Sequence, residues 1–204
     1  MAKHGYEEIL APNVYFDRQH NIEAAKILPG EYYATGRDMV LVTVLGSCVC
    51  ACIRDKKNGI GGMNHFMLPD AGYDKNNPLG ASARYGTYAM EILINQLLKI
   101  GAKRNNLEAK VFGGGAVLRG FTVANVGERN SEFVLNFLKA ENIPILAQDL
   151  LDIFPRKVYY FPNTGLVRVK KLKRVHNDTI ITRESEYVTR LRYTKVEGDV
   201  ELFE

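Results

Sequence analysis

The chain of 204 residues has few cysteines and no hydrophobic run long enough to cross a membrane. A transmembrane helix needs about 20 consecutive apolar residues, and no stretch approaches that length. The first residues, MAKHGYEEIL, carry acidic side chains and no long apolar segment, so the sequence predicts no secretory signal. We therefore expect a cytoplasmic protein without membrane insertion.

All three cysteines lie within five positions, in the segment LGSCVCAC at 45–52. A chain of this length can bury a sizeable core without disulfides, and an odd number of thiols would leave one unpaired. Alternate residues on a strand are about 6.5 Å apart, so a C-x-C bridge would strain the backbone. The pattern indicates reduced cysteines, as in the cytoplasm.

A metal or redox role for these cysteines is disfavoured by their spacing. On a strand, Cys48, Cys50 and Cys52 lie in a row on one face, whereas tetrahedral zinc sites use C-x2-4-C turns that curl around the ion. A redox pair needs C-x-x-C or a resolving thiol within reach. We therefore expect no metal site at these cysteines. Cys50 and Cys52, within VCACI, are typical of small buried hydrophobic residues, while Cys48 follows the Gly46-Ser47 bend and is the candidate reactive thiol.

The rest of the chain predicts one domain over residues 1–204, without repeats or low-complexity segments. Residues 1–30 are interpreted as an extension of mixed character, with regular structure beginning after Pro29-Gly30. Irregular alternation of strands and helices favours an α/β fold with mixed, sandwich-like sheets flanked by helices. The predicted strands are two segments within 38–55 joined at Gly46-Ser47, then 60–69, 107–115 and three further segments between 144 and 175. The predicted helices are 81–102 and 130–143. The charged tail from 176 is predicted to be a short helix or an added strand.

Three segments have competing interpretations. The basic stretch LVRVKKLKRV at 166–175 could bind nucleic acid, but its interleaved apolar residues favour an edge strand guarded by lysines, and no RNA-binding aromatic signature accompanies it. FGGGAVL at 112–118 lacks the Lys-Ser/Thr of a phosphate loop, so it is close backbone packing or a wall of the site. In VGERN, at 126–130, Asn130 or the following Ser131 is a candidate helix N-cap.

A thiol nucleophile needs a base or a cation beside it to lower its pKa. His4, His20 and His176 lie in polar segments, whereas His65 lies in the apolar run GGMNHFMLP. A hairpin across the Asn58-Gly59 turn would bring that run beside the cysteine strand. Cys48 and His65 are therefore the candidate nucleophile and base.

The sequence does not decide which residues supply two further parts of such a site, the group that orients the imidazole and the donors that bind an oxyanion. A third group would orient the imidazole, and the candidates are Thr43, Asn64 and Ser47. The backbone amides from Gly46 to Cys48 could hold an oxyanion.

The motifs LGSCVCACIRD, GGMNHFMLP, ARYGTYAME, KVFGGGAVL, VGERN and FPNTGLVRVKKL together resemble the CheD family, the chemoreceptor glutamine deamidases of bacterial and archaeal chemotaxis. The resemblance covers about 29–172 and leaves 1–28 and 173–204 as extensions. It implies a fold similar to the deamidase domain of cytotoxic necrotizing factor toxins. It also implies that Cys48 is the nucleophile and His65 the base of a deamidase acting on cytoplasmic helices of methyl-accepting receptors. The implied reaction uses no metal and no organic cofactor. A CheC-type phosphatase is a further implied partner, and the implied state is a monomer.

The family also uses a threonine upstream of LGSC, and here the sequence departs from the commonest pattern. The usual position, six residues before the cysteine, is Val42, and Thr43 lies five before it. A shift by one residue on a strand turns the side chain to the other face, although a bulge could restore it, so Thr43 is the candidate. This departure is the feature that favours a non-catalytic module binding receptor or phosphatase helices. A cysteine protease or amidase with another substrate shares the Cys-His logic.

Overall fold

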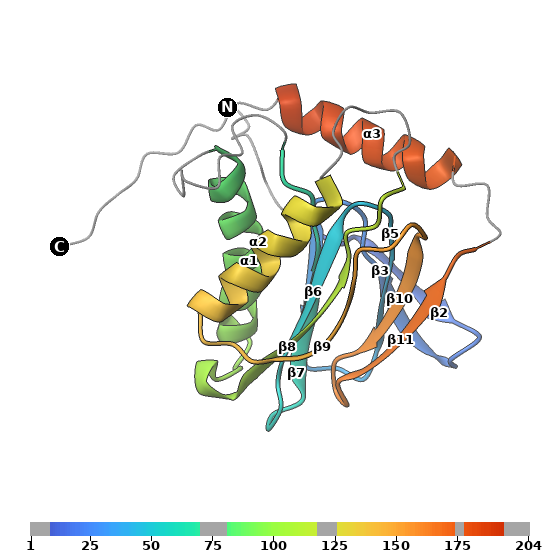
Figure 1. Cartoon of the computed structure of the whole chain (residues 1–204). Coiled ribbons are helices and arrows are strands. Elements are labelled where there is room, and N and C mark those ends of the chain that lie inside the picture. The colour runs from blue at the N-terminus through green and yellow to red at the C-terminus, as the bar shows by residue number, and fades with distance from the viewer. Residues whose placement is uncertain (1–8, 70–80, 118–125, 174–177, 194–204) are drawn as a thin grey trace, which may run out of the picture.

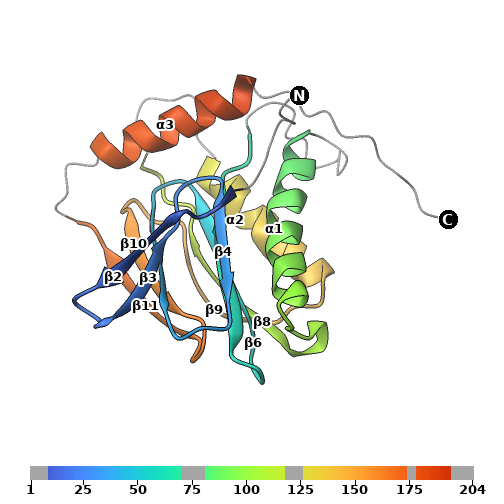
Figure 2. The ribbon, with the colours of Figure 1, turned by 180° about the vertical axis from the view of Figure 1, so that it is seen from behind.

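The computed structural model describes residues 9–69, 81–117, 126–173 and 178–193. Two mixed β-sheets lie face to face, two helices cover the outer face of the larger sheet, and a third helix crosses one end of the sandwich (Figures 1 and 2). The predicted α/β class, with mixed sheets flanked by helices, is confirmed. His4 and His176 lie outside the described residues.

The larger sheet contains the cysteine strand near its centre. Its strands follow the order β1 (Ile9–Leu10), β4 (Glu31–Thr35), β7 (Ile60–His65), β6 (Val49–Asp55), β8 (Leu107–Gly113) and β9 (Ile145–Leu150). The outer pairs β1–β4 and β8–β9 are parallel, and the pairs between them are antiparallel. The predicted hairpin of β6 and β7 is present, so the candidate base lies on the strand next to the one that contains Cys50 and Cys52 and begins directly after Cys48.

The smaller sheet carries the strand that precedes the Gly46-Ser47 bend. Its order is β11 (Leu166–Lys171), β10 (Arg156–Phe161), β5 (Val40–Leu45), β3 (Ile22–Lys26) and β2 (Asn13–Asp17). β3 and β5 are parallel, and the other pairs are antiparallel. The basic segment forms β11, which is an edge strand, as predicted, and both lysines of this strand are exposed.

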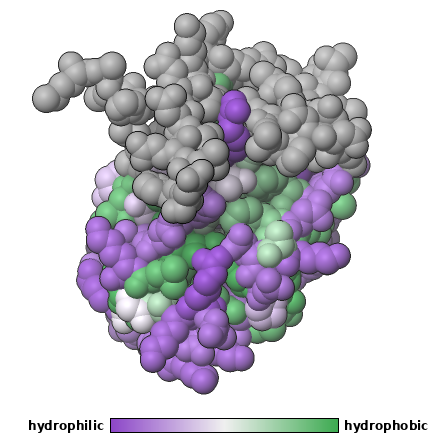
Figure 3. Space-filling view, turned by 90° about the vertical axis from the view of Figure 1, so that its left-hand side faces the viewer, coloured by the Kyte–Doolittle hydropathy of each residue, from purple (hydrophilic) through white to green (hydrophobic). Residues whose placement is uncertain are grey.

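Helices α1 (Ala81–Lys99) and α2 (Val126–Ala140) pack on the larger sheet, and the short 3-10 helix η1 (Arg104–Asn106) precedes β8. The outer face that the helices form is mixed, with hydrophobic side chains between hydrophilic ones (Figure 3). The N-cap prediction for α2 is wrong, because the helix begins at Val126 and places Asn130 and Ser131 in its interior. Both side chains bond to other backbone groups there, and the Ser131 hydroxyl donates to the Gly127 carbonyl at 2.7 Å.

The chain enters regular structure earlier than the sequence indicated. Strands β1, β2 and β3 lie within the segment interpreted as an extension, and β3 pairs directly with β5. β2 is an almost fully exposed edge strand, so it lacks the alternation that marks a half-buried strand. The tail forms a helix, α3 (Asp178–Tyr193), which crosses the end of the sandwich near the β5–β6 bend (Figure 1).

One hydrophobic cluster extends through both sheets and helices α1 and α2, and it includes all three cysteines, which are buried and unbridged. In the described part of the chain, no helix is long and apolar enough to cross a membrane. The same residues contain no group of three or more histidine, cysteine or acidic side chains placed to hold a metal ion.

Candidate active site

The bend at Gly46-Ser47 separates two buried strands of different sheets and places Cys48 immediately before β6. Two backbone hydrogen bonds from the glycine-rich segment hold the bend. Gly115 N–H donates to Gly46 O at 2.7 Å, and Gly114 N–H donates to Cys48 O at 2.8 Å. The bend is therefore held by backbone groups on both sides of Ser47.

The glycine-rich segment can approach this closely because it has no side chains. Gly113 has φ +115°, and a Cβ there would lie 2.2 Å from Cys48 O. At Gly114, φ is +68° and a Cβ would lie 2.2 Å from Ser131 Oγ. Larger residues would force the segment away from the bend. The segment therefore packs closely against the bend by its backbone, one of the two roles predicted for it.

Asn130 is a second support that sequence analysis did not identify. Its side chain is fully buried; Oδ1 accepts from Leu68 N–H at 2.9 Å, and Nδ2 donates to Ser47 O at 2.8 Å. One amide therefore ties the bend to the segment that follows His65. The sequence signal for this role was a polar residue within an amphipathic helix. That signal does not name the partners of Asn130, because they are distant in sequence.

His65 lies beside the cysteines across the β6–β7 pair. Cys52 is opposite Met63, and the bridge between Val49 and Phe66 continues the same antiparallel register. That register places Cys50 opposite His65 and Cys48 diagonal to it, a separation that side chains can span. Register alone therefore leaves two thiols near the imidazole.

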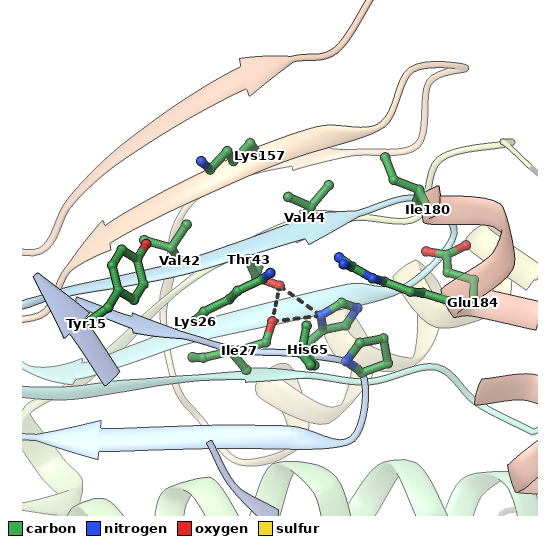
Figure 4. A pocket seen from close by; sticks show the side chains of 13 residues that line it. Tyr15, Lys26, Ile27, Val42, Thr43, Val44, His65, Lys157, Ile180 and Glu184 are labelled. Carbon is green, nitrogen blue, oxygen red and sulfur yellow. Dashed lines mark hydrogen bonds between the residues drawn. The ribbon is translucent and has the colours of Figure 1, made fainter. Parts of the chain in front are cut away.

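Hydrogen bonds to Nδ1 orient the His65 ring. The Thr43 hydroxyl donates to Ile27 O at 2.7 Å and lies 2.8 Å from His65 Nδ1, which is also 3.4 Å from Ile27 O (Figure 4). Because the hydroxyl proton goes to Ile27 O, Thr43 Oγ accepts from Nδ1–H. This tautomer leaves the lone pair on Nε2. Nε2 is buried and has no hydrogen-bond partner among the described residues.

Of the three candidates for the orienting group, Thr43 is the one that contacts His65. Asn64 faces the helical layer instead, where Nδ2 donates to Ala89 O at 2.9 Å. The Ser47 hydroxyl donates to a carboxylate of α3. Val42 packs in a separate small cluster of the smaller sheet, so the side chain that faces His65 belongs to Thr43.

The carboxylate belongs to Glu184 of α3, and it binds the amides of the bend. Oε1 accepts from Gly46 N–H at 2.9 Å and from Cys48 N–H at 3.2 Å. Oε2 accepts from Ser47 N–H at 2.9 Å and from the Ser47 hydroxyl at 2.6 Å. The predicted oxyanion loop is therefore a cradle that holds a carboxylate. Glu184 was not identified from the sequence, because it lies 136 residues from Cys48.

Burial controls the protonation of the two candidate catalytic groups. It raises the pKa of the Cys48 thiol well above its usual value, and the charge of Glu184 and a hydrogen bond to it raise it further. Burial lowers the pKa of His65 to about 4, against a weaker opposite effect of the Ile27 carbonyl. Near neutral pH the arrangement is therefore a protonated thiol and a neutral imidazole.

A cavity of about 320 Å³ adjoins His65 and Thr43 (Figure 4). One side is the β3–β4 connection from Ile27 to Pro29, the floor includes Thr43 and His65, and α3 contributes Ile180, Arg183 and Glu184. The cavity gives a small side chain room beside the imidazole.

Comparison with known proteins identifies relatives over nearly the whole chain. The family model described as "CheD chemotactic sensory transduction" matches residues 67–171. A protein of Herminiimonas arsenicoxydans is 67% identical over 97% of both chains, and one of Shewanella oneidensis is 60% identical over 94% of this chain and 93% of its own. They are named "Probable chemoreceptor glutamine deamidase CheD" and "Probable chemoreceptor glutamine deamidase CheD 1". The crystal structure of the Bacillus licheniformis hypothetical protein YfiH covers 71% of this chain and 62% of its own, with a TM-score of 0.34 and 12% identity.

Proposed function

Because the chain belongs to the CheD family, we propose that it is a protein-glutamine deamidase that hydrolyses glutamine side chains of chemotaxis receptors to glutamate and releases ammonia. The relatives' names support the reaction and the substrate class. The observation that carries the proposal is the cradle at Gly46–Cys48, which holds a carboxylate, the group that deamidation produces, beside a buried thiol.

His65 is proposed as the general base. Its low pKa, about 4, keeps the ring neutral near pH 7, so Nε2 can accept a proton. Thr43 and Ile27 hold the Nδ1–H tautomer that this requires. The high pKa of Cys48 means that its thiol keeps its proton until the base removes it.

The proposed reaction uses these groups in turn. His65 Nε2 takes the Cys48 proton, and Sγ attacks the carbonyl carbon of the substrate amide. The carbon–nitrogen bond breaks, ammonia leaves with the proton from His65, and a thioester remains. Neutral His65 then takes a proton from water, which attacks the thioester to give glutamate and the free thiol.

The backbone amides supply electrostatic stabilisation. The N–H groups of Gly46 and Cys48 converge on one oxygen of Glu184, at 2.9 and 3.2 Å. A substrate carbonyl oxygen at that position would receive both hydrogen bonds as it becomes negative. Loss of one such donor typically costs about 100- to 1,000-fold in kcat.

The alternative function is a non-catalytic chemotaxis module that binds receptor or CheC-type phosphatase helices. The sequence feature that favoured it was the threonine displaced by one position, whereas the contact between Thr43 and His65 supports the catalytic function. Hydrolysis of a different substrate would use the same groups. The CheC-type partner, the monomeric state, the single domain and the cytoplasmic location stay predictions from the sequence.

The test is direct conversion of receptor glutamines. Purified protein is incubated with cytoplasmic fragments of chemotaxis receptors, and glutamine-to-glutamate changes are mapped by mass spectrometry. The wild type should convert specific glutamines, and Cys48→Ala should convert none, because this substitution removes the proposed acyl acceptor.

The matched control is Cys50→Ala. Cys50 lies opposite His65 in the strand register and is equally buried, but its backbone N–H is not among the cradle donors. This variant should keep the conversion. Identical peptides from wild type and Cys48→Ala would reject the deamidase, and loss of conversion in Cys50→Ala alone would move the nucleophile to Cys50.

A further inference from the structure

Helix α3 closes the candidate site with a side chain of its own. It crosses the end of the sandwich beside the β5–β6 bend (Figure 1) and faces the cavity in Figure 4 through Ile180, Arg183 and Glu184. Glu184 is 2% exposed and is the α3 residue that reaches the bend. The amides proposed to bind substrate are therefore already occupied.

The fit between Glu184 and the bend is close. Its carboxylate receives three backbone N–H groups and one hydroxyl, all from consecutive residues of the cradle. A Cβ at Gly46 would lie 2.7 Å from Oε1 and 2.8 Å from Oε2. Any other residue at Gly46 would push the carboxylate out, so the cradle accepts a terminal carboxylate or carboxamide only because that position is glycine.

We propose that α3 is an autoinhibitory helix whose Glu184 occupies the cradle as a glutamate product would, so that α3 must leave before a receptor segment can bind. This inference rests on the proposed deamidase function. Glutamate is the product side chain of that reaction, and Glu184 presents it from a helix, beside Cys48. Its two oxygens are divided between the Gly46 and Cys48 amides on one side and Ser47 on the other.

Helix α3, of 16 residues, is attached through few of its described side chains. Besides Glu184, the described side chains that it buries are Tyr187 and Leu191, one helical stripe at spacings of three and four. The Tyr187 hydroxyl meets that of Tyr85 on α1, and the Arg190 guanidinium donates to Pro29 O at 3.1 Å. Most of the other described positions are exposed, and several are charged.

These contacts of the described side chains suit a helix that another helix can displace. Tyr187 and Leu191 hold the helix to the edge of the core, and neither contributes to the cradle or to the proposed catalytic groups. A competing helix that brings a glutamine and its own apolar stripe could replace both sets of contacts. In that case the apparent affinity for receptor is reduced by the fraction of molecules in which α3 is seated.

The decisive experiment places a glutamine of α3 in the cradle as a substrate for the catalytic groups of the same molecule. In Glu184→Gln, the new carboxamide lies where the product carboxylate lay, and the same steps would form an Sγ–carbon bond, release ammonia and restore glutamate after hydrolysis by water. Mass spectrometry of the peptide that contains residue 184 follows the conversion. Mixing with Cys48→Ala/Glu184→Gln, distinguished by an isotope label, shows whether conversion occurs within one molecule.

The expected result is conversion of residue 184 to glutamate in Glu184→Gln, independent of protein concentration, with none in the Cys48→Ala/Glu184→Gln partner. Receptor fragments are assayed in parallel with the wild type. If receptor glutamines are converted but residue 184 stays glutamine, the proposal that Glu184 occupies the cradle as a product would is wrong, and the proposed function stands. If neither is converted, the proposed function fails and this inference fails with it.

A second variant separates inhibition from a structural role. Tyr187→Ala/Leu191→Ala removes the two described apolar side chains that α3 buries and leaves the cradle intact, so receptor deamidation should rise several-fold, through a lower KM. Thr182→Ala, at an exposed position of the same helix, is the matched control and should change nothing. Unchanged or reduced activity in the double variant would show that α3 supports the site instead of covering it.

Discussion

Replacing Thr43 by valine removes one hydroxyl from the site and keeps the shape of the side chain. In the wild type this hydroxyl lies 2.8 Å from His65 Nδ1 and is anchored to Ile27 O at 2.7 Å. Thr43→Val leaves Nδ1–H with Ile27 O, at 3.4 Å, as its acceptor. The ring should then orient less firmly, and the tautomer with Nε2 unprotonated should be less favoured.

The expected loss is part of what a general base contributes. That contribution is about 100- to 10,000-fold, and since one of two orienting partners remains, we expect kcat to fall about 10- to 100-fold, or about 1.4–2.8 kcal/mol in the barrier. KM should change little, because Thr43 does not belong to the cradle. Stability should fall by only about 1 kcal/mol, the typical value of one hydrogen bond.

The assay is the initial rate of ammonia release from receptor fragments as a function of fragment concentration. Thr43→Ser is the matched control, because it restores the hydroxyl without the methyl group, and it should recover most of kcat. Full kcat in Thr43→Val would refute the orienting role. A serine variant as slow as the valine variant would show that the methyl group, not the hydroxyl, is what matters.

Three further predictions concern stability. Asn130→Ala should lower the free energy of unfolding by about 2–4 kcal/mol, because it strands two buried backbone groups; an unchanged denaturant midpoint would contradict this. Burial alone would raise the pKa of Asp55, but three backbone N–H donors and a side-chain amide lower it well below its usual value. Asp55→Ala should therefore be destabilised near pH 7, and the difference from wild type, measured by urea unfolding, should shrink in acid as the wild-type carboxylate is protonated. The pKa of His65 is about 4 when folded and 6.5 in the unfolded chain, so the unfolded state binds the proton first. Stability should be full above about pH 6.5 and fall by about 3 kcal/mol towards pH 4, with a shallower fall in His65→Gln; equal slopes would refute the burial of a neutral imidazole.

Short-range sequence signals predicted much of the central architecture. The valine-rich run broken at Gly46-Ser47 predicted two buried strands, and the Asn58-Gly59 turn predicted the hairpin that sets His65 beside the cysteine strand. Both depend on local chemistry, namely β-branched side chains, glycine at a bend and a two-residue turn motif. The chain carries these signals within a few residues of the structure that they specify.

The parts that were missed depend on contacts far along the chain. The exposed strand β2 is held by pairing with β3, not by an apolar face, so its pattern does not mark it as a strand. The early start of α2 and the bridging role of Asn130 follow from packing against the bend. Glu184 lies in a charged tail in which a buried carboxylate looks like any other acidic residue until the fold places it beside Ser47.

The threonine question shows where sequence and structure complement each other. Counting positions from the cysteine raised the prospect that the side chain facing the site is Val42. The bend lets the chain cross from one sheet to the other, so counting along a single strand does not apply, and Thr43 reaches His65 from the opposite sheet.

The most direct measurement of the central claim is interception of the thioester at Cys48. Receptor fragments are incubated with the protein in the presence of hydroxylamine, which competes with water for an acyl group, and the products are mapped by mass spectrometry. We predict glutamyl hydroxamate at the same positions at which glutamate forms without hydroxylamine, and neither product with Cys48→Ala. Glutamate formation without any hydroxamate, or hydroxamate formation by Cys48→Ala, would contradict covalent catalysis by this thiol.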